Sequence, residues 1–166
     1  MNSRILDFYR GGQDDQGRTL DEILNWTDVE LEAVHDFIQW LFPLPERSGA
    51  NPSAPMLEAA TIDAFLNSED LRQRLRLSFL RMLSFYGLEF RDGAVQPRAN
   101  FAARSANWLS PSNHNHLRLT RTLRSLRLLG LAAESTALFA ALAEIYANHP
   151  DRITLRTYQF WQNAVE

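Results

Sequence analysis

The sequence predicts an all-α protein: a single-domain helical bundle over residues 1–166, with about seven helices and one small β-hairpin near residues 88–96. Its 166 residues, 45% of them hydrophobic and 11% aromatic, are typical of one globular domain with a substantial core. Helix start and stop signals recur along the chain, and apolar residues repeat at helical spacing between them. One short segment has a strand-like pattern instead, and Asp92-Gly93 is its predicted turn.

The helices can be placed in order from their end signals. Thr19-Leu-Asp-Glu22 and Thr27-Asp-Val-Glu30 are capping boxes, in which the Thr and the Glu satisfy each other's exposed amides. The second box opens a helix over residues 28–42, which Pro43 ends because the residue before a proline disfavours helical geometry. Pro43, Pro45, Pro52 and Pro55 then make a stiff, extended connection. Further helices are expected from Thr61, over residues 69–86 behind the cap Ser68, within 100–109, and over 113–129, 132–148 and 151–164.

Several function classes are excluded by missing residue types. Without cysteine there is no disulfide, thiolate nucleophile or zinc finger. All 17 basic residues are arginine, so a Schiff-base lysine and a lysine-bearing phosphate loop are also excluded. This bias is typical of a GC-rich bacterial genome, and the alternative is selection for bidentate anion binding. No apolar run is long enough for a transmembrane segment, and the first residues lack a secretory signal, which predicts a cytoplasmic protein.

Charge is divided unevenly along the chain. Residues 1–70 have a balance of −10 and residues 71–130 a balance of +9, within a net charge of −3. The division favours two halves of one fold that attract each other, and the alternative is a basic half that binds nucleic acid or phosphate. No nucleic-acid partner is expected, because no basic surface interleaved with aromatic residues is present.

The predicted helix over residues 28–42 has one polar strip. Asp28, Glu32 and Asp36 lie at i, i+4 and i+8, where like charges repel. Solvent, arginines of the basic half or a divalent cation could compensate them. His35 and Gln39 lie on the same strip, and both a structural and a ligand-binding role stay open for them. Trp40 is expected in the core or beside a ligand.

The predicted helix over residues 113–129 begins with a cap, Asn113. Asn115 and His116 flank its leucine stripe and are expected to lean toward the core. His114, Arg118 and Arg121 lie on the opposite side, where the helix dipole also favours an anion. Carboxylates of the acidic half or a phosphate or carboxylate ligand could occupy this place. His114 and His116 make a poor metal pair, because side chains two residues apart on a helix point about 200° away from each other.

These two segments carry a family resemblance. The matching residues are Asp7–Gly11, His35, Ile38–Leu44, Asn51-Pro52, Phe85–Leu88, Asn107-Trp108, Asn113–Arg121, Leu126 and Leu128–Leu131. Over residues 5–131 the sequence resembles the conserved region of the opioid growth factor receptor family. The resemblance implies a receptor that binds an enkephalin peptide and associates with nuclear or other membranes in animal cells. It also implies that the two segments form one site.

The leading functional hypothesis is a non-catalytic binding module for a small anionic ligand or a peptide. Its site is predicted where the His35 helix meets the start of the Asn113 helix, from His35, Gln39, Trp40, Asn113, His114, Asn115, His116, Arg118 and Arg121. No catalytic residue, metal or cofactor is expected, and no oligomeric state is indicated. One alternative is an enzyme with His35 or His114 as general base and Arg118 or Arg121 as anion stabiliser. The other is a protein-interaction module that docks another protein through the exposed loop Pro43–Pro55 or through a basic face.

Overall fold

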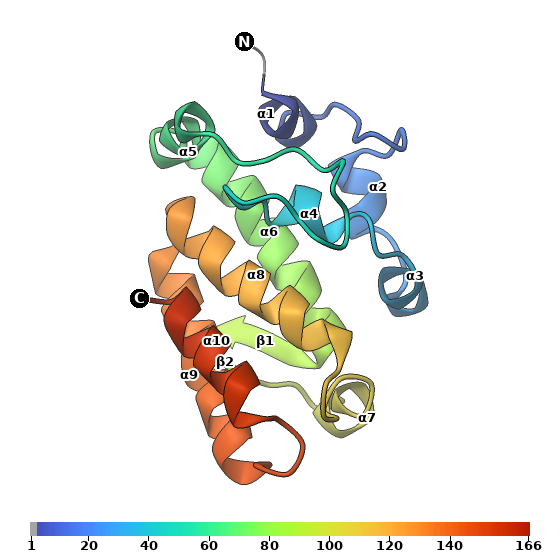
Figure 1. The fold of residues 1–166 in the computed structure, drawn as a ribbon, viewed down its shortest axis with the longest axis vertical. Coiled ribbons are helices and arrows are strands. Elements are labelled where there is room, and N and C mark those ends of the chain that lie inside the picture. The colour runs from blue at the N-terminus through green and yellow to red at the C-terminus, as the bar shows by residue number, and fades with distance from the viewer. Residues whose placement is uncertain (1–2) are drawn as a thin grey trace. The chain divides into compact units, whose positions relative to one another are not determined.

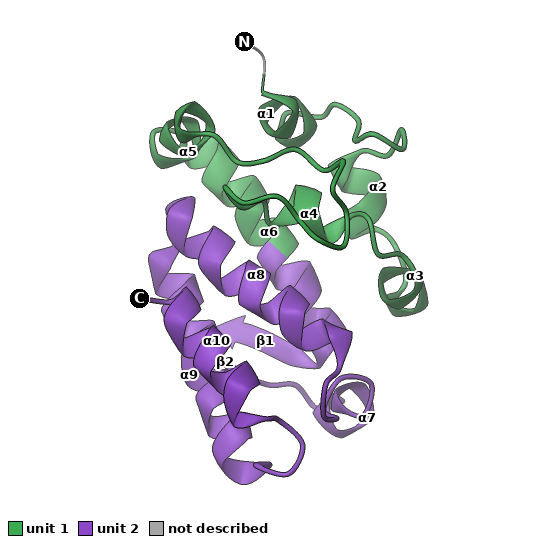
Figure 2. Cartoon of the chain, in the orientation of Figure 1, with its two compact units in different colours: residues 1–78 green, residues 79–166 purple. Residues whose placement is uncertain are grey.

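The computed structural model describes residues 3–166. In this part of the chain, ten α-helices accompany one two-stranded antiparallel sheet (Figure 1). The all-α fold with a small hairpin is therefore confirmed, although the helices outnumber the seven expected. The chain divides into two compact units, residues 1–78 and 79–166, with the boundary inside a helix (Figure 2). That the whole chain forms a single domain stays a prediction.

Unit 1 consists of short helices and the first part of a long one. They are α1 (Arg4–Tyr9), α2 (Leu20–Leu24), α3 (Asp28–Ala33), α4 (Ile38–Leu41), α5 (Ala59–Leu66) and the start of α6 (Glu69–Tyr86). Both predicted capping boxes are present, at Thr19 with Glu22 and at Thr27 with Glu30. Helix α5 begins at Ala59 rather than at Thr61. Helix α1 was not expected, because six residues are too few to show a helical repeat.

The core of unit 1 is organised around Tyr9, which is fully buried at the end of α1. Its hydroxyl donates a hydrogen bond to the carbonyl of Leu41 at 2.6 Å and lies 3.0 Å from Oγ of Ser78. Its ring packs edge-to-face on Phe65, with centroids 5.2 Å apart. Tyr9 thereby links α1, α4, α5 and α6, so short helices with little intrinsic stability share one packed centre.

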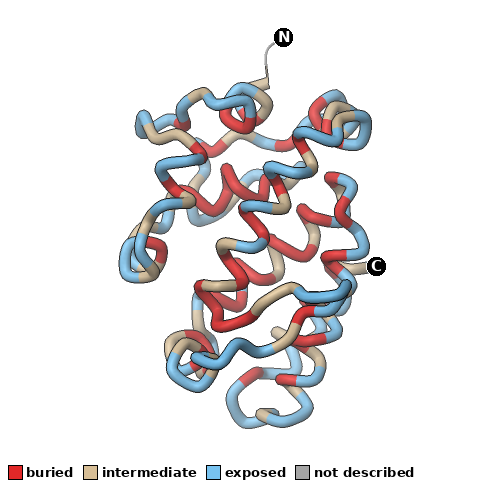
Figure 3. The backbone as a smooth tube through the Cα atoms, turned by 180° about the vertical axis from the view of Figure 1, so that it is seen from behind, coloured by how far each residue is buried: buried red, intermediate tan, exposed pale blue. Residues whose placement is uncertain are grey.

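Unit 2 contains the rest of α6, the hairpin and the longer C-terminal helices. These are β1 (Leu88–Arg91), β2 (Ala94–Pro97), α7 (Phe101–Ser105), α8 (His114–Leu128), α9 (Ala132–Asn148) and α10 (Leu155–Ala164). Helix α8 packs on α9 and α10, and α9 also packs on β2. Buried residues recur along the long helices, separated by exposed ones, as expected for amphipathic elements (Figure 3).

The hairpin has the turn that its sequence predicts. Asp92 and Gly93 both have positive φ, 52° and 80°, which is the requirement of a two-residue type I′ turn. Glu89 pairs with Gln96 in the strand register. Gly87, with φ 83°, separates α6 from β1. At Gly87 an added Cβ would lie 2.8 Å from Cβ of Arg104, so this close approach requires glycine.

Candidate functional site

The predicted site residues divide between the two units. His35, Gln39 and Trp40 lie in unit 1, and the six residues within Asn113–Arg121 lie in unit 2. Each group is described below within its own unit. Among residues 3–166 no three His, Asp or Glu side chains are grouped so that they could hold a metal ion. In the same range no helix is both long and apolar enough to cross a membrane.

The predicted helix over residues 28–42 is wrong as one element, because the chain leaves helical geometry at its middle. Helix α3 ends at Ala33, Val34 is extended with φ −95° and ψ 131°, and α4 starts at Ile38. His35 lies in the exposed connection. Phe37, fully buried, packs edge-to-face on Trp26 with centroids 5.5 Å apart. Such tertiary packing overrides local helix preference, and the acidic strip expected along one helix face does not form.

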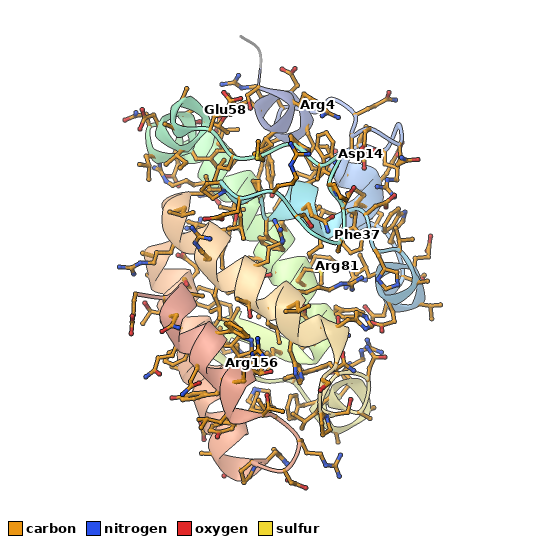
Figure 4. The ribbon with its side chains drawn as sticks, viewed as in Figure 1. Arg4, Asp14, Phe37, Glu58, Arg81 and Arg156 are labelled. Carbon is orange, nitrogen blue, oxygen red and sulfur yellow. The ribbon has the colours of Figure 1, made fainter. Side chains whose placement is uncertain are left out.

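Asp36 in this connection is compensated by Arg18. Its carboxylate accepts a hydrogen bond from Nη1 of Arg18 at 2.8 Å, and the same guanidinium donates through Nε to Asp14 at 2.8 Å. The Asp14 carboxylate is fully buried and also accepts from the backbone N–H of Gln16 and Arg18; Asp14 is labelled in Figure 4. Burial acts to lower the pKa of Arg18, but its bonds to Asp36 and Asp14 outweigh burial and raise that pKa. The partner of Asp36 thus comes from the acidic half of the sequence.

Gln39 is buried and anchors the proline-rich loop. Its side-chain oxygen accepts a hydrogen bond from Nδ2 of Asn51 at 3.4 Å, and its Nε2 donates to the carbonyl of His35 at 3.5 Å. Nδ2 of Asn51 also donates to the carbonyl of Asp36 at 3.4 Å. Asn51 was matched in the family motif but was not predicted as a site residue. Its place between four prolines was the available signal, because a polar side chain in a stiff loop can fix that loop.

Trp40 belongs to the core of unit 1. It is 1% exposed and packs on Phe8 with ring centroids 5.4 Å apart. The guanidinium of Arg4 lies 5.1 Å from the indole centroid, and Arg4 is labelled in Figure 4. Nε1 of Trp40 is buried and has no hydrogen-bond partner among residues 3–166. Of the two expectations for Trp40, the core position is confirmed.

The start of α8 is closed by the predicted cap. Oδ1 of Asn113 accepts a hydrogen bond from the N–H of Asn115 at 2.9 Å, and the Asn113 carbonyl accepts from the N–H of His116 at 3.0 Å. Nδ2 of Asn113 donates to the carbonyl of Asn107 at 3.0 Å and to Ser110. Two first-turn amides are therefore already engaged, which weakens this end of α8 as an anion site.

His116 is enclosed by indole rings, and the prediction that it leans to the core is confirmed. It is 3% exposed, and its ring lies edge-to-face with Trp108 and Trp161, at centroid distances of 6.4 and 5.6 Å. Nε2 donates to the carbonyl of Trp108 at 2.8 Å, so the neutral ring has its lone pair on Nδ1. Nδ1 is buried without a partner in the described part of the chain. Burial lowers the pKa of His116, the bond to Trp108 opposes this, and His114 adds a smaller lowering.

The basic residues of α8 do not all lie where the helical pattern placed them. His114 is exposed and Arg121 is half-buried, but Arg118 is only 5% exposed. Nη1 of Arg118 donates to Oδ1 of the fully buried Asn115 at 3.4 Å. The expected position of Arg118 opposite the core is thus wrong. The reason is that eight of the 15 residues of α8 are buried, so neighbours cover more than one face of the helix.

The ionisable side chains of α8 are nevertheless all basic. The helix contains four arginines, two histidines and no acidic residue. Of the arginines, Arg127 is exposed and Arg121 and Arg124 are half-buried. The positive charge that α8 exposes most fully is therefore that of Arg127.

Comparisons with known proteins agree on one family. The family model described as "Opioid growth factor receptor (OGFr) conserved region" matches residues 2–164. The opioid growth factor receptor of Mus musculus is 44% identical over 121 residues, which cover 69% of this chain and 19% of the relative. The Homo sapiens receptor is 42% identical over 123 residues, 69% of this chain and 18% of its own length. Opioid growth factor receptor-like protein 1 of Xenopus tropicalis is 41% identical over 119 residues, 69% and 23% of the two lengths. The chain spans about a fifth of the length of these relatives, and no solved structure matches it.

Proposed function

This chain belongs to the opioid growth factor receptor family, and we propose that it is a non-catalytic binding module for a small anionic ligand or a peptide. The matched relatives are named as receptors, which supports recognition of a ligand rather than a reaction. Since the chain corresponds to about a fifth of those receptors, ligand binding by this region is part of the proposal. We extend the proposal to a cytoplasmic location, which imaging of a fluorescent fusion protein can test.

The observation that carries the proposal is the basic character of α8. Four arginines without an acidic residue on one helix favour an anionic partner, and His114 and Arg127 on it are exposed. A peptide could supply the negative charge through its terminal carboxylate. The ring of His116 is enclosed, so this histidine cannot act as a general base, which must reach the proton that it removes.

Calorimetric titration with an enkephalin peptide, the ligand class that the family resemblance implies, can test the proposal. The peptide is used with a free carboxylate and as its C-terminal amide, and inorganic phosphate is a third probe. We expect the carboxylate form to bind more tightly than the amide, and we expect higher salt to weaken this preference.

A double variant, His114→Ala with Arg121→Gln, tests the location. We expect its affinity for the carboxylate peptide to fall by at least about two- to fivefold, which is the effect of removing the partly exposed charge of Arg121. Arg152→Gln is the matched control, because Arg152 is an exposed arginine of unit 2 outside α8. Equal affinity for acid and amide, equal affinity of the double variant and the control, or no binding of any probe would contradict the proposal.

A further inference from the structure

A cavity of about 170 Å³ lies within unit 2, between the hairpin and α9. Its lining combines six apolar residues with four polar ones: Leu88, Val95, Pro97, Phe101, Ala141 and Ile145, and Gln96, Glu144, Asn148 and His149. None of them belongs to the site residues of α8 described above. The cavity is therefore a separate feature of the fold.

The buried residues of the lining, which form the inner part of the cavity, are apolar, and the whole cavity has about the volume of one ring. Leu88, Val95 and Ile145 are buried, and Ala141 and Ile145 lie one turn apart on the same face of α9. An apolar cavity of about 150 Å³ can accommodate a benzene ring. A compact apolar group, aromatic or branched aliphatic, would therefore occupy most of the cavity, against its apolar lining.

The outer part of the cavity is electronegative. Glu144 and Asn148 lie one turn apart and are exposed, and His149 follows as the C-cap of α9. The carbonyl end of a helix carries partial negative charge, which favours a cation. Helix α9 has no basic residue in its last turn to neutralise this end, and the residues that line the cavity include no arginine. Arg152, three residues beyond the cap, lies 3.7 Å from the carboxylate of Asp151.

We propose that this cavity is a binding site for a small organic cation, with a ring-sized apolar body inside and an ammonium or guanidinium group beside Glu144. The apolar lining would take the body of the ligand. The Glu144 carboxylate and the end of α9 would hold its positive group. The proposal does not depend on the function proposed for α8, which prefers the opposite charge.

Three probes of similar size and different charge can test the proposal on the full chain: benzylammonium, benzyl alcohol and benzoate. Two-dimensional NMR at about pH 8, where free imidazole is neutral, measures their affinity and maps their position. We expect affinity to fall in that order, with the largest shift changes at the backbone amides of Val95, Ala141 and Ile145. Equal affinity of the three probes, no saturable shift with benzylammonium, or shifts confined to other parts of the chain would overturn the proposal.

Two variants test the charge of Glu144 and the volume of the cavity separately. Glu144→Gln should weaken benzylammonium about two- to fivefold, as expected for a partly exposed ion pair, and leave benzyl alcohol unchanged. Ala141→Leu should reduce the affinity of both by filling the cavity. Asp92→Asn is the matched control, because it removes one negative charge from unit 2 at a turn where Asn tolerates positive φ. If Glu144→Gln and Asp92→Asn have the same affinity for benzylammonium, the proposed role of Glu144 is wrong. Should Ala141→Leu fail to fold, the map of shift changes in the wild type still tests the cavity.

Discussion

Acidification should destabilise the protein through His116. An unfolded histidine has a pKa of about 6.5, and burial holds the pKa of His116 in the folded protein below its ordinary value. Between these two pKa values the unfolded state binds more protons than the folded state, so the free energy of unfolding rises with pH. The stability that the neutral ring contributes is therefore complete above about pH 6.5, and it is lost as pH falls toward the lowered folded pKa.

The size of the effect follows from the surroundings of the ring. Protonation would place a charge on Nδ1, which is buried between two indoles and has no acceptor among residues 3–166. One histidine can change the free energy of unfolding by at most about 1.4 kcal/mol per pH unit. His116→Gln should abolish this dependence, since an amide does not titrate and can still donate to the Trp108 carbonyl. A variant without a donor, His116→Leu, should be about 0.5–1.5 kcal/mol less stable than His116→Gln at every pH, because the Trp108 carbonyl then keeps only the N–H of Ser110 as its partner.

Urea unfolding, followed by tryptophan fluorescence between about pH 5 and pH 8, can measure these effects. His35→Gln is the matched control, because His35 is exposed and should leave the pH dependence of the wild type intact. We expect the stability curves of wild type and His116→Gln to run parallel above about pH 7 and to diverge below it. The reasoning is refuted if the two proteins lose equal stability on acidification, or if His35→Gln removes the dependence instead.

Two further predictions concern the loop and the hairpin. Asn51→Ala should release the proline-rich loop from Gln39 and Asp36, so trypsin should cleave faster after the exposed Arg47; an unchanged cleavage rate in a mass-spectrometric time course would argue against the anchor. Gly87→Ala should lower the free energy of unfolding in urea by about 1–3 kcal/mol more than Gly93→Ala does. Both glycines have positive φ, but of the two only Gly87 would bring an added Cβ against neighbouring atoms. Equal losses of stability in the two variants would disprove the clash.

Local signals predicted the elements whose geometry is decided within a few residues. Asp92-Gly93 predicted the hairpin turn, because both central residues of a type I′ turn have positive φ and Asp and Gly tolerate this conformation. The capping box at Thr27 and the cap at Asn113 placed two helix starts, because each bond is formed within the first turn. The last helix starts at Leu155, four residues later than expected, because Oγ1 of Thr154 accepts a hydrogen bond from the N–H of Thr157 and caps the helix there.

Interactions between distant residues decided the rest and could not be predicted from local pattern. The helical repeat continues through Val34, but the packing of Phe37 on Trp26 and the bond from Arg18 to Asp36 favour an extended connection there. The burial of Arg118 likewise depends on which neighbours cover α8, and a helical wheel contains no information about them. Both errors concern residues of the candidate site, so each changes which side chains a ligand could reach.

The buried positions of the family motifs have a structural explanation that limits what the motifs say about function. In Ile38–Leu44, the side chains of Ile38, Trp40 and Leu41 are buried, and Gln39 holds a loop rather than facing solvent. In Asn113–Arg121, the backbone carbonyl of the buried His116 accepts a hydrogen bond from Nε1 of Trp161. The ring of His116 donates a hydrogen bond to the carbonyl of Trp108. We expect a chain that shares these residues to share this packing, whether or not it binds the same ligand. Differences in binding between family members should therefore arise at exposed positions outside these motifs, such as Glu144 at the cavity.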